Sequence, residues 1–591
     1  MKHFLQKLSW HWWIVCAFGW GGFVHDIAGF VPYINGDGKV LKWNPVGVAY
    51  DGRLVNPTTK AIRYYLATDA WSTANRDAEL NAVRACFAQW QAVSGTSLRF
   101  EDAGLAPKGE LLVTGDKTNL VFWAKKSRLV GGVDLTNLRG YTAVELDVDN
   151  NILEADVVFN GLDYSWFTSI TNTRTAEQFV EAVALHEIGH LIGLDHTPVG
   201  GGTVIPAANG LSTAIGLSAD EIAAVRFLYP LGPFRTQIGA IGGKVMAGTQ
   251  GVFGAAIFAE SLQGNIVAGT VSAVDGSYSL EALPVGSYQI RATPLDPPTA
   301  TDGLSLFRGR DVSGDFVGAN TSFRPSAQVA AVVMGAQKSI VNLTVVSGVP
   351  PLRIMGLNNP DTVPGAETRD RTAMKVTLGR QNFYIGIAST NVTPGTTLSV
   401  TGDGITVGPT QFLTNRFQNN IHALVAFASV ATNATPGLRS FVIRRGGDVA
   451  YANGYLEILP NVSDNNYDGL DDSFQRRFFP LWTAANAAPG FDADADGFSN
   501  QFEAASGTNP TDSSSVSFLI RSVQMTSQGS KLEWRSDVGR RYAIYSRPEF
   551  SSKQAWKVLG SPVTAAGDVT SYLDVSTPGV VKFYRLQLLP P

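Results

Sequence analysis

Apolar residues recur with two different periods along the chain, and the change of period divides the sequence. Leu80, Val83 and Phe87 follow one another at intervals of three and four residues, which predicts a helix with one buried face. The preceding residues, 61–66, form a short run typical of a strand. After Pro230 the apolar runs are short, rich in β-branched residues and interrupted by glycine. The first third is therefore predicted to mix helices with strands, and the remainder to be mostly β structure.

Further elements of the first third are marked by apolar runs and by helix start signals. Residues 111–123 and 142–160 are apolar runs that predict additional strands. A hydroxyl residue followed three positions later by Glu or Gln is a capping-box pattern, which marks the start of a helix. The pattern occurs at Thr175 with Gln178 and at Ser218 with Glu221. We therefore expect a helix after each signal, the first of them ending near Leu191.

Length and composition set the number of domains and exclude one class of function. At 591 residues the chain is too long for one hydrophobic core, and about four domains are expected. With a formal net charge of −4 and only 16% charged residues, the sequence offers no basic face for nucleic acid. Its two cysteines, Cys16 and Cys86, provide no disulfide framework. We expect a monomer that binds no nucleic acid.

Residues 1–29 have the pattern of a secretory signal peptide. Lys2 and Lys7 precede an apolar run, residues 10–24, that is too short for a comfortable transmembrane helix. No pair of small residues marks a clear cleavage site, so an uncleaved anchor is the alternative. A lipid-modified Cys16 is a weaker alternative, because the residues before it do not form a lipobox. We therefore expect a secreted, extracellular protein, with attachment to the cell surface as the variant of that prediction.

The stretch from His186 to His196 holds the densest group of candidate functional residues. On a helix, His186 and His190 project from one face, close enough to bind one metal ion. Gly193 can end the helix with a tight turn, which would bring His196 back as a third ligand. Three imidazoles leave a fourth zinc position open for water, as in catalytic sites. Glu187 could then take a proton from that water.

Two other interpretations of this stretch are weaker. In the first, the histidines are core residues of a buried helix. The chain has seven histidines. Three lie in its first 25 residues and His422 lies far downstream. The other three all fall in this one motif, which weighs against chance. In the second, zinc is purely structural, but structural zinc is usually closed by four protein ligands, often cysteines. The sequence offers no such set beside the motif.

The motif His-Glu-x-x-His-x-x-Gly-x-x-His is complete in residues 186–196, and it resembles the active site of metzincin metallopeptidases. The resemblance to the matrixin branch covers residues 61–230. Within it, residues 155–166 look like the strand and tryptophan before the active-site helix, and residues 217–222 look like the closing helix. The resemblance implies an α/β catalytic domain with a mixed, twisted sheet and helices.

The same resemblance implies the chemistry. It assigns one catalytic zinc ion to His186, His190 and His196, with Glu187 as the general base of peptide-bond hydrolysis. Family substrates lie extended along an edge strand, here expected within residues 142–148.

The sequence also departs from the matrixin pattern. Val204-Ile205-Pro206 stands where matrixins carry Met-Tyr-Pro beneath the zinc, so the apolar floor would be valine. The wall of the pocket for the substrate's P1′ side chain is expected near the same residues. Val158 occupies the position of a histidine that holds a second, structural zinc in many animal matrixins, so one zinc is expected. The prodomain cysteine switch is missing as well.

After Pro230 the sequence resembles binding and spacer modules. Residues 275–288 resemble a carboxypeptidase regulatory-like β-sandwich, a family that does not catalyse. Residues 394–400 and 436–441 are turn-and-strand signals that resemble an immunoglobulin-like module of the IPT/TIG type. His422 lies in a strand pattern there and is expected to be an ordinary strand residue.

A second metal pattern follows the sandwich modules. Its carboxylate and amide positions fit a calcium loop of the EF-hand type, with glycine at the sharp turn, and they are Asp492, Asp494, Asp496, Asn500 and Glu503. An earlier copy, with Asp464, Asn466 and Asp468, ends in Gln475 instead of glutamate and is expected to bind more weakly. The pair resembles thrombospondin type 3-like or dockerin-like repeats, which implies structural calcium. The alternative is an Asp-rich solvated linker.

These observations predict a multidomain chain in which an α/β metzincin domain precedes all-β sandwich modules. The predicted segments are a signal peptide (1–29), a matrixin-like peptidase domain (30–230), a carboxypeptidase regulatory-like sandwich (231–349), an Ig-like sandwich (350–460), calcium-binding repeats (461–513) and a C-terminal β-domain (514–591).

The function implied by the resemblance is that of a secreted zinc endopeptidase acting on extracellular proteins and peptides. The β-modules would bind extracellular matrix or a cell-surface polymer. The competing hypothesis is a secreted adhesion or matrix-binding protein with a vestigial peptidase domain. The absent methionine favours that hypothesis, whereas Glu187 weighs against it, because a residue that binds no zinc has no evident use beside intact ligands except catalysis.

Overall fold

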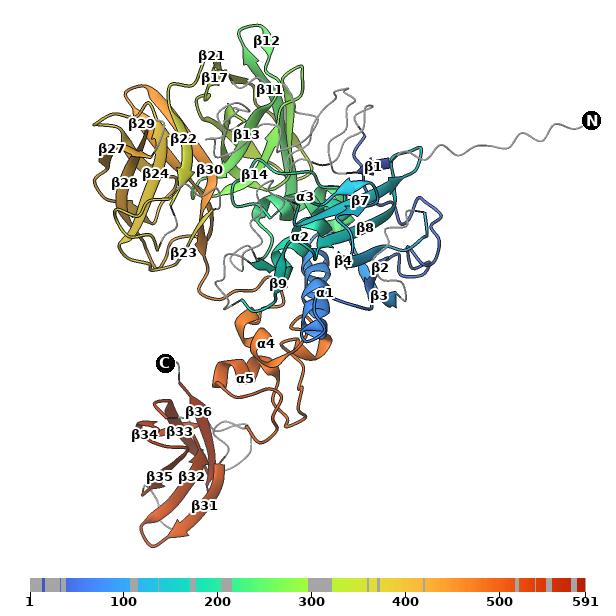
Figure 1. Ribbon diagram of the computed structural model, residues 1–591. Helices are drawn as coiled ribbons and strands as arrows, with labels where there is room; N and C mark the ends of the chain where they lie inside the picture. The colour runs from blue at the N-terminus through green and yellow to red at the C-terminus, as the bar shows by residue number, and fades with distance from the viewer. Residues whose placement is uncertain are drawn as a thin grey trace, which may run out of the picture. The chain divides into compact units, whose positions relative to one another are not determined.

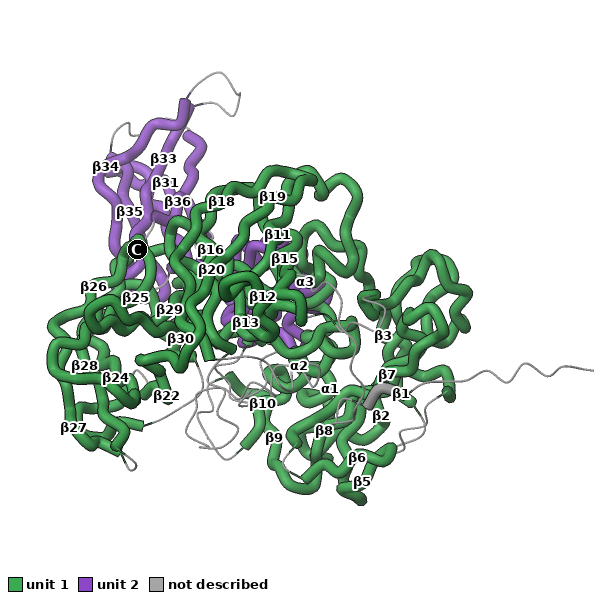
Figure 2. Tube along the Cα trace, turned by 90° about the horizontal axis from the view of Figure 1, so that it is seen from above, with its two compact units in different colours: residues 1–467 green, residues 468–591 purple. Residues whose placement is uncertain are grey.

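The computed structural model is mostly β structure with few helices (Figure 1). It describes the backbone of residues 13–15 and, with side chains, residues 32, 39–106, 115–136, 138–170, 177–203, 215–295, 322–358, 361–368, 373–417, 420–515, 520–536, 538–548, 555–575 and 582–589. The chain divides into two compact units, Met1–Tyr467 and Asp468–Pro591, which Figure 2 distinguishes by colour. The finer domain boundaries stay predictions.

A six-stranded sheet forms the first part of unit 1. Its strands, in spatial order, are β1 (Trp13–Val15), β7 (Gly140–Leu146), β8 (Ile152–Asn160), β4 (Leu120–Ala124), β2 (Ile62–Ala67) and β3 (Phe100–Ala106). Strands β8, β4, β2 and β3 run parallel, whereas β7 is antiparallel to both β8 and β1. Two small strand pairs accompany it: β5 (Leu129–Val130) with β6 (Val133–Asp134), which is antiparallel, and β9 (Ser165–Phe167) with β10 (Glu177–Phe179), which is parallel.

Three helices share one hydrophobic cluster with this sheet: α1 (Arg76–Ala92), α2 (Val180–Leu191) and α3 (Ala219–Leu228). Helix α2 contacts α1, β7 and β8, and every one of its residues is buried. The indole N–H of Trp90 on α1 donates to the carbonyl of Leu185 on α2, at 3.1 Å. Cys86 of α1 is also buried, and its thiol lies 3.5 Å from the Glu181 carbonyl oxygen of α2. The apolar spacing therefore identified the helix that supports α2.

The structure corrects two predictions of local structure. The run at 142–160 is two antiparallel strands, β7 and β8, because the chain reverses through the turn at Asp147–Asn150. The helix after Thr175 does not start at a capping box: Gln178 lies in strand β10, α2 starts at Val180 without a side-chain cap, and Thr175 lies outside the described residues. By contrast, Ser218 and Glu221 do form the predicted capping box of α3.

Two further pairs of sheets complete unit 1, after the 3₁₀ helix Gly232–Gln237. In the first pair the strands are β11 (Ile238–Ala247), β12 (Gln250–Gly251), β15 (Ser277–Pro284), β19 (Lys338–Ile340) and β20 (Leu343–Thr344) against β13 (Ala255–Ser261), β14 (Ile266–Val271), β16 (Gly286–Pro294) and β18 (Val329–Val333), with β17 (Phe323–Arg324) and β21 (Val346–Ser347) alongside. Side chains of both sheets share one hydrophobic cluster, as in a β-sandwich.

The second pair has the same layout. Its strands are β22 (Arg353–Leu357), β24 (Phe383–Thr390), β26 (Ile405–Val407), β27 (Gln411–Phe417) and β28 (Ile421–Val430) against β23 (Met374–Thr377), β25 (Thr397–Val400), β29 (Gly437–Arg445) and β30 (Asp448–Leu459). These sheets also share one hydrophobic cluster. His422 lies in β28, and its Nδ1 accepts a hydrogen bond from the Asn415 N–H at 3.0 Å, an ordinary role for a strand residue.

Unit 2 consists of two short helices and two small sheets. The helices are α4 (Asp472–Phe478) and α5 (Asn500–Ser506), with a 3₁₀ turn at Ala485–Ala487 between them. The sheets contain β31 (Ile520–Thr526), β32 (Gly529–Arg535) and β35 (Val569–Asp574), and β33 (Arg541–Arg547), β34 (Lys557–Thr564) and β36 (Phe583–Leu588). Trp534 is buried in their shared cluster, whereas Trp556 lies under the guanidinium of Arg547.

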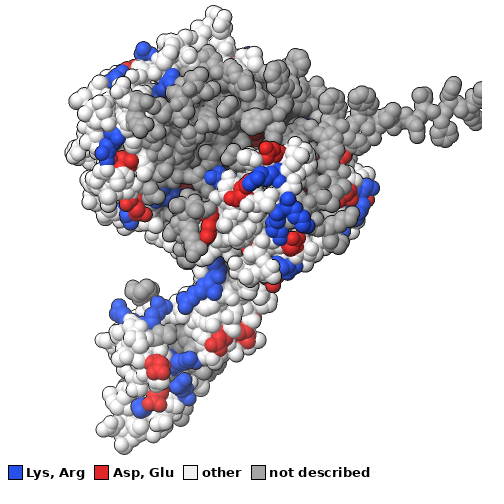
Figure 3. Space-filling model, viewed as in Figure 1, with Lys and Arg blue, Asp and Glu red and all other residues white. Residues whose placement is uncertain are grey.

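Charges of both signs share the face of the molecule that Figure 3 draws, where described Lys and Arg residues are interspersed with Asp and Glu. Among the described residues, no helix is both long and apolar enough to cross a membrane.

Arg291 on β16 forms a buried ion pair with Glu260 on β13 and links the first sandwich to the second through Asn453 and Ser440. Its guanidinium donates to Glu260 Oε2 at 2.7 Å, to Asn453 Oδ1 at 2.9 Å and to Ser440 Oγ at 2.9 Å. We predict that Arg291→Met lowers the free energy of unfolding by about 3–5 kcal/mol, because it leaves the Glu260 charge buried without its partner. Urea denaturation of the full chain measures the change.

The double variant R291M/E260M is the control for that prediction. It removes both charges, so it should recover much of the lost stability. An R291M variant within about 1 kcal/mol of the parent would show that the ion pair contributes little, as exposed pairs do.

Candidate metal centre

The turn after α2 brings the third histidine back to the helix. Gly193 ends the helix with a φ of +105°, a backbone conformation that favours glycine. A Cβ at this position would also lie 2.2 Å from the carbonyl oxygen of Leu41. The N–H of Gly193 donates to His190 O, and that of Leu194 donates to Gly189 O, both at 3.0 Å. The glycine-terminated turn predicted from the sequence is therefore present.

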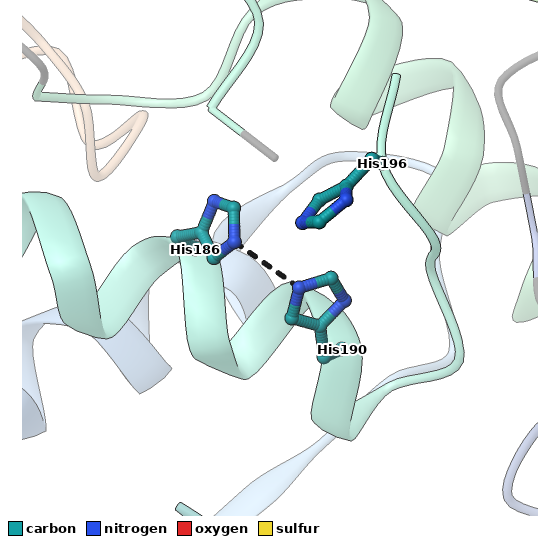
Figure 4. A group of neighbouring side chains, drawn as sticks. All are labelled: His186, His190 and His196. Carbon is teal, nitrogen blue, oxygen red and sulfur yellow. Dashed lines mark hydrogen bonds between the residues drawn. The ribbon is translucent and has the colours of Figure 1, made fainter. Parts of the chain in front are cut away.

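The three histidines converge on one point (Figure 4). His186 and His190 come from adjacent turns of α2, and their Nε2 atoms lie 3.1 Å apart. The ring centre of His196 lies 5.3 Å from that of His186 and 5.0 Å from that of His190. One ring nitrogen of each residue lies within 4.8 Å of the others. Three imidazoles at this separation can share a single metal ion.

Backbone carbonyls fix how the first two rings present their nitrogens. His186 Nδ1 donates to Thr203 O at 3.1 Å, and His190 Nδ1 donates to Leu194 O at 2.8 Å. Because the proton is used at Nδ1, each Nε2 presents a lone pair, and the two lone pairs face each other. Burial lowers the pKa of His186 to about 3 and that of His190 to about 4, so both rings are neutral at neutral pH. A divalent cation removes the repulsion, so the donor set fits zinc.

Glu187 lies next to this cluster and is held by the edge strand. The hydroxyl of Thr142 on β7 lies 2.8 Å from Glu187 Oε2 and 2.9 Å from Glu187 O. Burial raises the pKa of Glu187 to about 8, while the hydrogen bond from Thr142 acts in the opposite direction. A Cβ at Gly140 would come within 3.0 Å of the carboxylate. Strand β7 therefore leaves room for Glu187 and orients it.

Other residues of the peptidase segment have more modest surroundings. Asp195 accepts the backbone N–H of His196 at 2.7 Å, which stabilises the turn before the third histidine. Val158 is buried in an apolar cluster with Phe122 and Tyr141. The segment Val204-Ile205-Pro206, predicted to floor the zinc site and the P1′ pocket, lies outside the described residues.

The second metal pattern forms a loop before α5. Carboxylate oxygens of Asp492, Asp494 and Asp496 lie within 4.8 Å of one another. Gly497 has a φ of +94°, and its N–H donates to Asp492 Oδ2 at 2.8 Å, which closes the sharp turn. Apart from the histidines, this is the other group of three or more candidate metal-ligating side chains found in the described part of the chain.

Two buried oxygens at the end of this loop have no hydrogen-bond partner among the described residues. Glu503 is 1% exposed; its Oε1 accepts from the Thr508 hydroxyl, whereas its Oε2 has no partner. Asn500 Oδ1 is also buried without a partner, although its Nδ2 donates to two carbonyls. Burial, and then the charges of Asp494 and Asp496, raise the pKa of Glu503 to about 7. Buried oxygens left in this way are expected where a cation binds.

The earlier copy of the loop differs at its last position. Asp464 and Asn466 belong to unit 1, whereas Asp468 belongs to unit 2. The amide of Gln475 donates to Asp468 Oδ2 at 2.8 Å and to Ala487 O at 3.0 Å. A neutral amide thus uses one carboxylate oxygen that calcium would need. This contact agrees with the predicted weaker binding, which stays a prediction.

Sequence reasoning missed three contributors to the metal centre: Thr142, the Thr203 carbonyl and the Leu194 carbonyl. Carbonyl partners carry no sequence signal, because every residue has the group. Thr142 could have been singled out only by knowing that β7 lies against α2. His186 and Thr203 are 17 residues apart in the sequence, and Thr142 and Glu187 are 45 residues apart.

Comparisons with known proteins agree with the first metal pattern. The model of the matrixin family matches residues 56–230. Metalloendoproteinase 5-MMP from Arabidopsis thaliana is 42% identical over 50 residues, which cover 8% of this chain and 14% of that protein. The match therefore spans a small part of the relative's length.

The similarity to solved structures is weak. Titin domains A168–A170 match at 11% identity with a TM-score of 0.12, covering 53% of this chain and 74% of that one. Titin domains Z1Z2 in complex with telethonin match at 11% identity with a TM-score of 0.11, covering 38% and 95%. The resemblances of the later modules stay predictions. The family model confirms the matrixin part of the sequence resemblance. Residues 56–230, which contain the three histidines and Glu187, are similar to the matrixins.

Proposed function

We propose that this protein is a secreted zinc-dependent endopeptidase that hydrolyses peptide bonds of extracellular proteins. The observation that carries the proposal is the convergence of three histidines whose first two rings are fixed with their Nε2 atoms facing each other. The matrixin match over the same residues supports a metalloendopeptidase rather than another zinc enzyme. His186, His190 and His196 would hold one zinc ion.

Glu187 is the proposed general base. When bound, zinc would supply Lewis-acid chemistry, polarising the scissile carbonyl and lowering the pKa of water towards about 7. Glu187 would take the proton from the attacking water and pass it to the leaving amine. The hydroxyl of Thr142 orients the carboxylate for both transfers. The positive charge of a bound cation would also favour the ionised carboxylate that a base requires.

Strand β7 is the proposed substrate-binding edge. The predicted range for this edge, residues 142–148, overlaps β7, whose inner neighbour is β8. The backbone of β1 pairs antiparallel with residues 143–145 on the outer side, so this edge can accept an extended strand. β1 falls within the predicted signal peptide, residues 1–29. Removal of that peptide would leave the edge open for a substrate in the same geometry.

The alternative is a secreted adhesion or matrix-binding protein with a vestigial peptidase domain. The valine at position 204, where matrixins carry methionine, favours this alternative, but Val204 lies outside the described residues. The buried Glu187, oriented by the Thr142 hydroxyl, weighs against it, because burying a carboxylate is costly and this one forms no ion pair within the described part of the chain. Protein and peptide substrates are therefore the primary partners proposed, with a matrix or cell-surface polymer as a partner of the later modules.

We also propose that the loop Asp492–Glu503 binds structural calcium. The support is the cluster of three aspartates together with the buried, partnerless oxygens of Glu503 and Asn500. Hard oxygen ligands at this spacing suit calcium, and extracellular modules of this kind bind it at about 10⁻⁴–10⁻³ M. Calcium at that concentration is found outside the cell, which fits a secreted protein.

We predict that Glu187→Gln retains about one zinc ion per chain but lowers kcat for casein cleavage by roughly 10²–10⁴-fold, because only the proton transfer is lost. Zinc content is measured by atomic absorption, and cleavage with and without a chelator. The control is Glu533→Gln, which removes a partly exposed carboxylate in unit 2 and should cleave like the parent. A zinc-loaded parent that cleaves nothing would favour the adhesion alternative.

We predict that millimolar calcium protects unit 2 from heat, because the ion binds only the folded loop. The midpoint of thermal unfolding should rise with calcium in the parent and should rise much less in Glu503→Gln. Asp568→Asn, which removes an exposed carboxylate of the same unit, should respond like the parent. An equal response of E503Q and the parent would support the solvated-linker interpretation.

A further inference from the structure

The segment from Thr197 to Thr203, here called the post-histidine loop, connects the third histidine to the carbonyl that holds the first. It starts directly after His196, and the Thr203 carbonyl accepts the Nδ1–H of His186 at 3.1 Å. The Thr203 N–H in turn donates to Glu221 Oε1 at 2.8 Å. Any shift of this loop would therefore move groups at two of the three histidines.

Val199, in the middle of the loop, is buried in the sandwich modules rather than in the peptidase segment. It is 0% exposed and belongs to a hydrophobic cluster whose other members all come from the two sandwiches. They are Ala256, Phe258, Ile266, Val271, Ala273, Leu295 and Leu438. The Val199 side chain therefore packs against residues of both sandwich modules and anchors the loop to them.

Two of the glycines that follow, Gly200 and Gly201, let the loop pack closely against β29 and β30. The Gly200 N–H donates to Asn453 O at 2.9 Å. A Cβ on Gly200 would lie 1.9 Å from the ring of Tyr455, and one on Gly201 would lie 2.4 Å from the Leu438 side chain. Tyr455 is itself in the core of the second sandwich and cannot move easily. A side chain at position 200 would therefore push the loop away.

Asp220 ties the start of the loop to the first sandwich. This buried residue of α3 accepts the Thr197 hydroxyl at 2.6 Å with Oδ2 and the Gly269 N–H of β14 at 2.7 Å with Oδ1. One carboxylate thus bridges the residue after His196 and a strand of the following module. The bridge is independent of the contacts made by Val199 and Gly200.

We propose that the two sandwich modules position the metal centre, by gripping the post-histidine loop through Val199, Gly200 and Asp220. These three are positioning residues, because they act on the histidines only through the loop. The proposal rests on the zinc site of the proposed function and adds that the sandwiches are part of the catalytic unit rather than spacers. Groups that orient metal ligands typically change metal affinity by about 10–100-fold when they are altered.

The test compares matched variants of the full chain. Val199→Ala removes the anchor, whereas Val245→Ala makes the same truncation at an equally buried position in the core of the first sandwich, away from the loop. The dissociation constant for zinc is measured by competition with a chelator, and hydrogen exchange is followed in peptides covering residues 195–203. We expect V199A to weaken zinc binding by about 10–100-fold and to speed exchange in the loop. V245A should lower the melting temperature but leave zinc affinity within about twofold of the parent. The reason is that a substitution usually has little effect on a distant site with which it shares no partners.

A second pair guards against a variant that simply misfolds. Gly200→Ala introduces the collision with Tyr455, and Gly447→Ala adds the same atom in open space on the β29–β30 hairpin. G200A should weaken zinc binding and G447A should not. Parental zinc affinity in both V199A and G200A would overturn the proposal, as would equal weakening in V199A and V245A, which would show a general effect of stability. A parent that binds zinc but cleaves no protein would overturn the peptidase function alone.

Discussion

The metal centre depends on two hydrogen bonds from imidazole Nδ1 atoms to backbone carbonyls. They decide the tautomer of His186 and His190, and so decide that both Nε2 lone pairs point to the same place. Without them the rings could rotate or exchange protons, and four-residue spacing on a helix would guarantee only that the side chains are neighbours. The orientation of these bonds is in turn set by the backbone around Leu194 and Thr203.

Both carbonyls are placed by backbone that packs against segments outside the histidine motif. Leu194 follows the turn at Gly193, where a side chain would collide with the carbonyl oxygen of Leu41. Thr203 ends a loop that is packed against the sandwich modules. The zinc site is therefore built by the assembly of a helix, a glycine turn and a loop anchored elsewhere. This dependence gives the β-modules a physical reason to remain attached to the peptidase segment.

Burial gives the site its electrostatic character. The low pKa values of His186 and His190 and the high pKa of Glu187 have the same first cause, the removal of charged forms from water. A nearby cation would relieve the opposition of the two Nε2 lone pairs and would favour the ionised form of Glu187. The candidate calcium loop follows the same logic, because burial and then the charges of its aspartates raise the pKa of Glu503. In both places the fold leaves polar groups that a metal ion would satisfy.

The sequence by itself determined the features that depend on residues close together along the chain. The spacing of His186 and His190 on one helix, the turn at Gly193, the capping box at Ser218 and the sharp turn at Gly497 all follow from local geometry. Only the tertiary structure decided that α2 starts at Val180, that Thr142 orients Glu187, and that Val199 inserts between two later modules. These contacts join segments far apart in the chain, and a backbone carbonyl or a buried valine looks the same in a sequence wherever it packs.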